Sequence, residues 1–269
     1  ARSHQYNIVI KDRCFSAISE IPIREVLESN FYILDTTSDW REKALFRKIE
    51  NNATPLKSIL RFSRGIKTSN DKRFISNVNF VEDSYKVYRG RNIKAFKLNW
   101  AGEYIWYRPD LMKEKVGCLP HTKDFFEVPE KLITQRVNSS HQLLVAYDDN
   151  QQYFLDTTNV SNMKSWDKTT SLKLLCGILN SKLINFWYSK KYTLPTISGY
   201  ELDTIPIKKG RFDNQIIEIV NRILNSEPTN QMIIIIDKLV YQQYELNYDE
   251  ILIIDPETPI TREEYESNE

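Results

Sequence analysis

Arginine and lysine side chains occur beside hydrogen-bonding neighbours in two short segments, and this combination suits contacts to phosphate groups and base edges. A guanidinium is a planar fork that can donate two hydrogen bonds to a phosphate or to guanine O6 and N7, and an asparagine amide can pair with adenine. Lysines and hydroxyls on a turn can bond phosphate oxygens. The candidate nucleic-acid contacts in these segments are Arg64, Lys67, Thr68 and Asn70, and Arg89, Arg91, Asn92 and Lys94.

The second segment, RGRNIK, is predicted to be extended. Alternate side chains of an extended segment share a face, so we expect Arg89 and Arg91 on one face and Asn92 on the other. The alternative for these residues and for Arg64 is an exposed edge strand that its charges keep soluble. For Lys67, Thr68 and Asn70 the alternative is turn chemistry, in which Gly65 supplies backbone freedom and Asn70 with Asp71 completes a bend.

Two further pairs of residues have the right chemistry. Gln135 and Arg136 lie in the apolar segment KLITQRV, where they suit base readout, although strand alternation alone would place one of them in solvent. Lys190 and Lys191 end a predicted helix, where cations are favourable and could also contact phosphates. Tryptophans could stack on bases but are more often core residues, and this applies to Trp40, Trp100, Trp106, Trp166 and Trp187.

The charge is unevenly distributed along the chain, although the net charge is only +1. Residues 41–100 contain 15 Lys and Arg against 5 Asp and Glu, and residues 151–210 contain 8 against 4. Residues 211–269 contain 4 against 13. A basic middle suits a surface that neutralises phosphates and releases their counterions. The alternative is a solvated basic helix followed by an acidic tail.

The sequence lacks the motifs of the enzymes that act on nucleic acids. It contains no Pro-Pro pair, as an Asn/Asp-Pro-Pro-aromatic methyltransferase element would require, and no Walker loop or GxGxxG. The spacing between Asp110 and Glu114 in the sequence is too short for the carboxylates of a metal-dependent nuclease. No serine or cysteine occupies a nucleophile elbow. The sequence therefore predicts a non-catalytic chain without a cofactor.

Cysteine and histidine usage indicates neither a disulfide framework nor a metal site. Cys14, Cys118 and Cys176 are odd in number and show no CxxC spacing, which makes a reducing cytoplasm the expected compartment. The three histidines are scattered. The apolar run around Met232–Ile236 is far shorter than the roughly 18–20 residues that span a bilayer, so we expect no contact with a membrane.

The pattern of elements predicts an α+β fold, with a β-rich recognition domain followed by C-terminal helices. Short β-branched and aromatic runs separated by polar turns continue to about Asp156, after which residues 171–191 predict one amphipathic helix with Thr170 or Ser171 as N-cap. Further helices are expected near 214–225 and 229–244. We predict an entry segment or linker at 1–39, a recognition domain at 40–207, a helical region at 208–254 and a frayed acidic tail at 255–269.

Four patterns in this order resemble the TaqI-like C-terminal specificity domain of type IIG restriction-modification DNA methyltransferases, which is related to type I specificity subunits. They are ILRFSRGIKTSNDKRFI, YKVYRGRNIKAF, EKLITQRV, and LLCGILNSKLINFWY with LPTISGYELDTIPI. The resemblance covers roughly residues 40–254.

The resemblance implies a target-recognition module for double-stranded DNA. Such a module directs adenine methylation, with or without cleavage, by a methyltransferase domain of the same polypeptide or of a partner subunit. The alternative interpretation is a protein-interaction or scaffold module, whose basic stretch binds an acidic neighbour within a multidomain enzyme.

Overall fold

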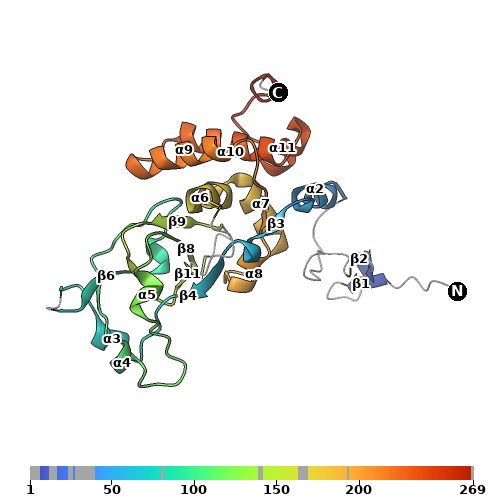
Figure 1. Ribbon diagram of the computed structural model, residues 1–269. Coiled ribbons are helices and arrows are strands. Elements are labelled where there is room, and N and C mark those ends of the chain that lie inside the picture. Colours follow the sequence, from blue (N-terminus) through green and yellow to red (C-terminus); the bar gives the residue numbers. More distant parts are fainter. Residues whose placement is uncertain are drawn as a thin grey trace. The chain divides into compact units, whose positions relative to one another are not determined.

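The computed structural model describes most of the chain, and Figure 1 shows its helices and strands. The described residues are 7–11, 17–23, 27, 40–79, 82–138, 142–162, 169–192 and 194–267. The chain divides into two compact units, residues 1–48 and 49–269. The first contains the antiparallel strands β1 (Asn7–Lys11) and β2 (Ala17–Pro22) and most of helix α2 (Trp40–Glu50). All the candidate residues from Arg64 onward lie in the second unit.

One antiparallel sheet of the second unit has its described strands in the order β4–β11–β8–β9. Their bounds are β4 (Arg61–Arg64), β11 (Thr158–Asn162), β8 (Lys131–Gln135) and β9 (Val145–Asp148). Strand β11 places Arg64 opposite Asn159 on one side and Gln135 opposite Thr158 on the other. The ends of β4 and β8, which are far apart in the sequence, therefore lie beside the start of β11.

A second sheet has its described strands in the order β10–β6–β7–β5. Strand β10 (Tyr153–Phe154) joins β6 (Ser84–Tyr88) in parallel, and β7 (Tyr104–Trp106) pairs antiparallel with β6 and with β5 (Ile75–Ser76). The remaining short elements of this part are β3 (Thr54–Pro55), η2 (Leu56–Ser58), α3 (Asp71–Phe74), η3 (Gly90–Asn92), α4 (Pro109–Met112) and α5 (Lys123–Phe126).

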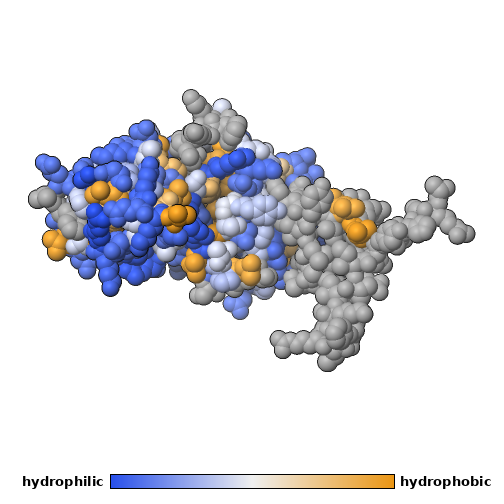
Figure 2. Space-filling view, turned by 90° about the horizontal axis from the view of Figure 1, so that it is seen from below, coloured by the Kyte–Doolittle hydropathy of each residue, from blue (hydrophilic) through white to orange (hydrophobic). Residues whose placement is uncertain are grey.

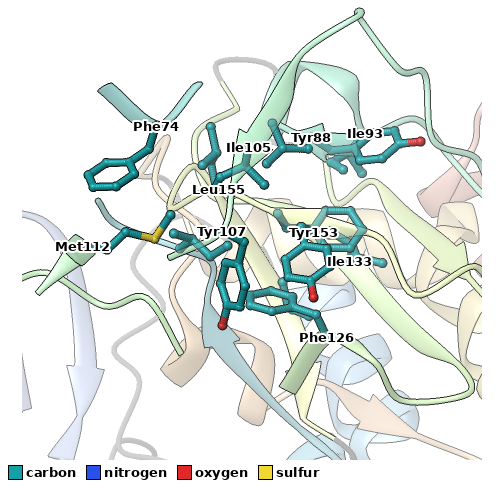
Figure 3. Packing of buried hydrophobic residues seen from close by; sticks show 14 of the residues in the cluster. Phe74, Tyr88, Ile93, Ile105, Tyr107, Met112, Phe126, Ile133, Tyr153 and Leu155 are labelled. Carbon is teal, nitrogen blue, oxygen red and sulfur yellow. The ribbon is translucent and has the colours of Figure 1, made fainter. Parts of the chain in front are cut away.

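The two sheets share one hydrophobic cluster, which is rich in aromatic rings. Tyr153 lies at its centre, with ring centroids 4.5 Å from Tyr85, 4.8 Å from Tyr107 and 4.9 Å from Phe126. Figure 3 shows Tyr107, Tyr153 and Phe126 side by side. Ile133 of the first sheet belongs to the same buried cluster. The alternating apolar pattern of the predicted strands therefore produces one core, as half-buried strands require.

A buried ion pair fixes the pairing of β8 with β9. Lys131 and Asp148 lie opposite each other in the two strands, and their side chains, 0% and 1% exposed, approach to 2.6 Å. The Lys131 ammonium also donates to the Phe126 carbonyl at 2.6 Å. Asp148 accepts hydrogen bonds from the backbone of Asn150 and Gln152. Such complete pairing is what a buried charge requires.

The predicted helix over 171–191 is two helices, α6 (Leu172–Asn180) and α7 (Lys182–Lys191). Ser171 is the N-cap of α6, and its side chain accepts a hydrogen bond from the Lys173 N–H, as expected. Ser181 has an extended conformation and caps the start of α7 through a bond from the Ile184 N–H. The prediction of one continuous helix is wrong because an apolar pattern does not reveal a serine that interrupts the backbone hydrogen bonds.

A layer of helices forms the C-terminal part of the chain, as Figure 1 shows in orange and red. Its helices α9 (Asp213–Asn225) and α10 (Asn230–Gln243) confirm the two predicted ones, and α11 (Tyr248–Ile254) and α12 (Arg262–Glu266) follow. The expectation of a frayed tail is wrong for the described residues, because Thr261 caps α12 and Tyr265 is only 3% exposed. The apolar residues within the acidic stretch anchor it.

The predicted α+β fold, with a β-rich part followed by helices, is confirmed. Helix α8 (Gly199–Asp203) and strand β12 (Pro206–Ile207), which pairs with β3, connect the two parts. Within the described residues, no helix is long and apolar enough to cross a membrane.

Candidate nucleic-acid interface

The turn at residues 155–158, between β10 and β11, is where the two arginine-containing segments meet. From the first segment, the Gly65 N–H donates to the Thr158 carbonyl at 3.1 Å and the Ile66 N–H to the Phe154 carbonyl at 2.7 Å. From the second, the Gly90 N–H donates to the Thr157 hydroxyl at 2.9 Å. These bonds bring both segments to one place in the fold.

Glycine is required at both approaches because the backbones nearly touch. A Cβ at Gly65 would lie 2.3 Å from the Leu155 carbonyl oxygen, and a Cβ at Gly90 would lie 2.6 Å from the Thr157 carbonyl oxygen. Both distances are shorter than any real Cβ contact, and the opposing atoms are backbone atoms that cannot swing aside. The glycines of the two segments are thus required by close packing. For Gly65 this differs from the expectation, which was that glycine supplies backbone freedom at a turn.

Arg136 joins the same turn from the end of β8. Its N–H donates to the Thr157 carbonyl at 2.9 Å, and its guanidinium donates to the Asp156 carbonyl at 3.1 Å. Partial burial lowers the pKa of Arg136, and the charge of nearby Arg64 lowers it further. Arg64 itself is exposed at the end of β4. We call Arg64 and Arg136 the arginine pair.

The arginine pair concentrates positive charge where few carboxylates are close. Asp156 is the one acidic group that raises the pKa of Arg136, and no side-chain partner of Arg64 is found in the described part of the chain. Two neighbouring guanidiniums repel each other unless an anion lies between them. This arrangement is therefore suited to a phosphate, which each guanidinium can bind with a pair of hydrogen bonds.

His121 holds the backbone of Arg64, a role that the sequence did not indicate. Its Nε2 lies 2.7 Å from the Arg64 carbonyl oxygen, and its ring stacks on Phe125 with centroids 3.9 Å apart. Burial lowers the pKa of His121, so the ring is neutral at pH 7 and donates through Nε2. A scattered histidine gives no sequence pattern, so only the structure identifies it as a positioning residue.

Arg89 is bound within the fold. Its Nε lies 3.0 and 2.9 Å from the two carboxylate oxygens of Glu103, and its Nη1 lies 3.6 Å from Asp71. Asp71 also accepts a hydrogen bond from Thr68 at 2.6 Å. These contacts join the two segments to each other, so Arg89 and Thr68 help to position the surface.

Arg91 differs from Arg89 in exposure. Its side chain is 69% exposed, and its guanidinium lies 3.5 Å from Glu103, whose side chain is only 14% exposed. Exposed ion pairs of this kind contribute little, so Arg91 remains able to bind a ligand.

We expect Arg89→Ala to lower the free energy of unfolding by about 2 kcal/mol, because it leaves the half-buried Glu103 without its main partner. Arg91→Ala should change stability by less than about 0.5 kcal/mol. Urea unfolding of the two variants, followed by circular dichroism, checks this difference. Equal midpoints for both variants would contradict the structural role of Arg89.

The expectation of an extended segment at residues 89–92 is wrong. Gly90–Asn92 forms the 3-10 helix η3, and the Asn92 carboxamide oxygen accepts the Arg89 N–H at 2.7 Å. Asn92 is only 5% exposed, so its pairing with a base, and the opposite faces predicted for the segment, are not supported. The Gly90 N–H contact with Thr157 draws this segment into a turn.

The remaining residues of the first segment have mixed roles. Asn70 caps α3 by accepting the Lys72 N–H at 3.1 Å, which is the expected turn chemistry. Lys67 is exposed, and its backbone pairs with Leu119. Lys94, in the second segment, is also exposed. Lys67 and Lys94 therefore keep their ammonium groups at the surface.

The other two predicted pairs also contain residues that differ in exposure and in their contacts. Gln135 is half-buried at the end of β8 and donates weakly to the Ile93 carbonyl at 3.4 Å. Lys190 lies 5.7 Å from the Phe186 ring and is half-buried. Lys191 is only 8% exposed and forms an ion pair with Glu50, so the structure does not support its contact with phosphate.

The described tryptophans mostly serve the fold. Trp187 is 2% exposed and donates to Glu50 at 2.8 Å, Trp100 donates to the Glu103 carbonyl, and Trp106 stacks on Phe74. Trp40, in the first unit, is 74% exposed. Trp166 lies outside the described residues.

The side of the molecule on which α3 and α4 lie in Figure 1 has a mainly polar surface. Figure 2, seen from below that view, shows its described residues as largely hydrophilic, with hydrophobic residues scattered among them. A surface of this kind suits a polar, charged ligand better than a broad apolar partner.

The comparison with protein families agrees with the predicted resemblance. Residues 85–207 match the family model of the TaqI-like C-terminal specificity domain, which confirms the resemblance over this part of the chain. A solved structure of the Type IIL restriction-modification enzyme MmeI in complex with DNA matches with 9% sequence identity and a TM-score of 0.39. The match covers 78% of this chain and 34% of that chain, so this chain spans about a third of that enzyme's length. No curated protein sequence gives a significant match.

Proposed function

We propose, from the TaqI-like specificity domain matched at residues 85–207, that this chain is a DNA target-recognition module. The observation that supports this most directly is the arginine pair, because the pairing of β4, β11 and β8 places Arg64 and Arg136 beside the turn where both segments converge. Phosphate binding by the pair would supply affinity. The residues that we propose for further contacts are Lys67, Arg91, Lys94, Gln135 and Lys190.

The proposed partner is double-stranded DNA, and the reaction belongs to other domains. In this proposal a methyltransferase domain of the same polypeptide or of a partner subunit methylates adenine, as in type IIG enzymes, and cleavage is a separate activity of the assembled enzyme. The chain itself needs no cofactor and works in the cytoplasm. The basic residues of the middle region and the acidic C-terminal helices fit this division, because only the former favours phosphates.

We expect Arg64→Ala and Arg136→Ala each to weaken binding to a short duplex about tenfold at about 0.15 M salt, because each removes a charged phosphate contact. The slope of log affinity against log salt should fall in magnitude by about one per variant. Fluorescence anisotropy with a labelled duplex measures both quantities. A random pool of duplexes, sequenced after selection, shows whether one short motif is enriched.

The matched control is Arg222→Ala, which removes an exposed arginine of α9 that is paired with Glu218. This variant should bind DNA like the parent chain. An equal loss for Arg222→Ala and Arg64→Ala would mean that only net charge matters. If no duplex binds even at low salt, the scaffold alternative replaces the DNA proposal.

A further inference from the structure

The first turns of α10 carry an unusual run of apolar residues at Met232–Ile235. Successive residues of a helix are about 100° apart, so four in a row point to nearly every side of it. All four are half-exposed, whereas Ile236, Leu239 and Val240 further along the helix are buried. A surface helix normally places polar residues on its outer side. This part of α10 is therefore apolar on a side that the described residues do not cover.

A groove of about 320 Å³ follows this side of α10. Ile234 and Ile235 form its floor from α10, and Pro259 and Ile260 form the facing wall from the segment before α12. The wall is well anchored, since Ile260 is 4% exposed and its carbonyl accepts a hydrogen bond from the Tyr248 hydroxyl at 2.9 Å. The groove is thus built by ordered elements, and its lining combines these apolar residues with the polar side chains of Gln231, Lys238, Glu264 and Ser267.

The segment 255–267, which we call the rim of the groove, is acidic. It contains five carboxylates, of which Glu264 lines the groove, and only one basic residue, Arg262. Arg262 is already paired with Asp249 and Glu266. Glu257 and Glu263 are exposed, and neither has a cationic partner in the described part of the chain. Lys238, the one cation that lines the groove, donates to the Glu264 backbone carbonyl.

We propose that this groove binds an amphipathic helix of a partner protein, with an apolar stripe flanked by lysine or arginine. An apolar groove receives such a helix through residues spaced three and four apart, and a complementary charge around it selects the partner. This inference stands on the C-terminal helices alone and does not depend on DNA binding by the arginine pair.

The negative charge of the rim disfavours other occupants of the groove. A duplex or an anionic membrane surface would be repelled by the carboxylates of the rim. A second copy, joined by two-fold symmetry, would place two acidic rims against each other, because such an interface uses the same patch on both subunits. A basic amphipathic helix is the occupant for which both the apolar part of the lining and the acidic rim are favourable.

The probe is a fluorescein-labelled peptide of about 18 residues, built of leucine and lysine with the leucines at helical spacing. A matched peptide carries glutamate in place of every lysine. Titration with the full chain, followed by fluorescence anisotropy, should give saturable binding of the lysine peptide that weakens as salt is raised. The glutamate peptide should bind at least tenfold more weakly.

Variants of the chain locate the binding. Ile235→Glu in the lining and Glu263→Lys at the rim should each weaken binding of the lysine peptide about tenfold or more. Leu252→Glu, on an exposed position of α11 outside the groove, is the control and should leave binding unchanged. Circular dichroism shows whether each variant folds. If Ile235→Glu does not fold, the binding measured with Glu263→Lys decides the question.

Three results would overturn the proposal. One is equal binding of the lysine peptide to all variants, and another is equal binding of both peptides to the parent chain. The third is a concentration-dependent dimer of the parent chain, seen by sedimentation and abolished by Ile235→Glu. That result would make a second copy of the chain the occupant.

Discussion

Replacement of Gly65 by alanine should lower the free energy of unfolding by more than about 3 kcal/mol, because the added Cβ has no room. It would lie 2.3 Å from the Leu155 carbonyl oxygen, 2.6 Å from the Phe154 carbonyl oxygen and 2.8 Å from the Leu155 carbonyl carbon. The turn at 155–158 must then move away from β4, which breaks the hydrogen bonds from Gly65 and Ile66. Urea unfolding followed by tryptophan fluorescence measures the loss.

Gly210→Ala is the matched control for this substitution. A Cβ there would meet only the Gln243 side chain, at 3.6 Å, which is an ordinary contact. This variant should unfold at or slightly above the urea concentration of the parent chain, since alanine lowers the entropy of the unfolded chain. If the two variants unfold at the same midpoint, the close approach at Gly65 is not a constraint on the fold.

The same substitution also connects the fold with the proposed function. Arg64 precedes Gly65, and Arg136 is bonded to Asp156 and Thr157 of the turn. A shift of the turn away from β4 therefore moves Arg136 relative to Arg64. Gly65→Ala should consequently weaken DNA binding even under conditions in which most of the protein is folded, whereas Gly210→Ala should not.

Local patterns were sufficient to predict most of the elements. The alternating runs in SYKVYRG, EYIWYR and KLITQRV gave β6, β7 and β8, and the helical spacing near the C-terminus gave α9 and α10. Strand β11, with the sequence TNVSN, was harder to recognise, because Asn159 and Ser161 are polar residues that the fold buries. Their partners come from distant segments, and no local pattern contains them.

At the candidate site, the differences between expectation and structure come from contacts between distant residues. Asn92 had a suitable side chain, but the contact of Gly90 with Thr157 bends its segment and buries it. Lys191 had a suitable place at a helix end, yet its ammonium pairs with Glu50. For the candidate site, the sequence supplied Arg64 and Arg136 as separate residues, and only the pairing of β4, β11 and β8 brings them together.

A buried carboxylate joins the C-terminal helices to α7, and its charge should make this contact dependent on pH. Asp237 of α10 is 3% exposed and accepts the Lys182 N–H at the start of α7 at 2.8 Å. Burial raises the pKa of Asp237 to about 7, and the bond from Lys182 and its charge oppose this increase. The neighbouring charges are Lys182 and Asp255, which pair at 2.5 Å. The Tyr241 hydroxyl is buried without a hydrogen-bond partner among the described residues.

The sign of the pH dependence follows from the direction of the shift. An unfolded aspartate has a pKa near 3.9, so between about pH 4 and pH 7 the folded chain holds a proton on Asp237 that the unfolded chain has lost. The stability from this group is therefore fully present below about pH 4 and is lost as the pH rises through about 7. Three pKa units correspond to roughly 4 kcal/mol, which is the upper limit of the effect.

We expect Asp237→Asn to remove this dependence, because the carboxamide keeps an oxygen for the Lys182 N–H and cannot ionise. The variant should be more stable than the parent chain at pH 8, by up to about 4 kcal/mol, and the difference should become small near pH 4.5. Thermal unfolding of both chains between pH 4.5 and 8.5 measures it. Parallel stability curves across this range would show that Asp237 stays ionised in the folded chain, and that Lys182 compensates its burial fully.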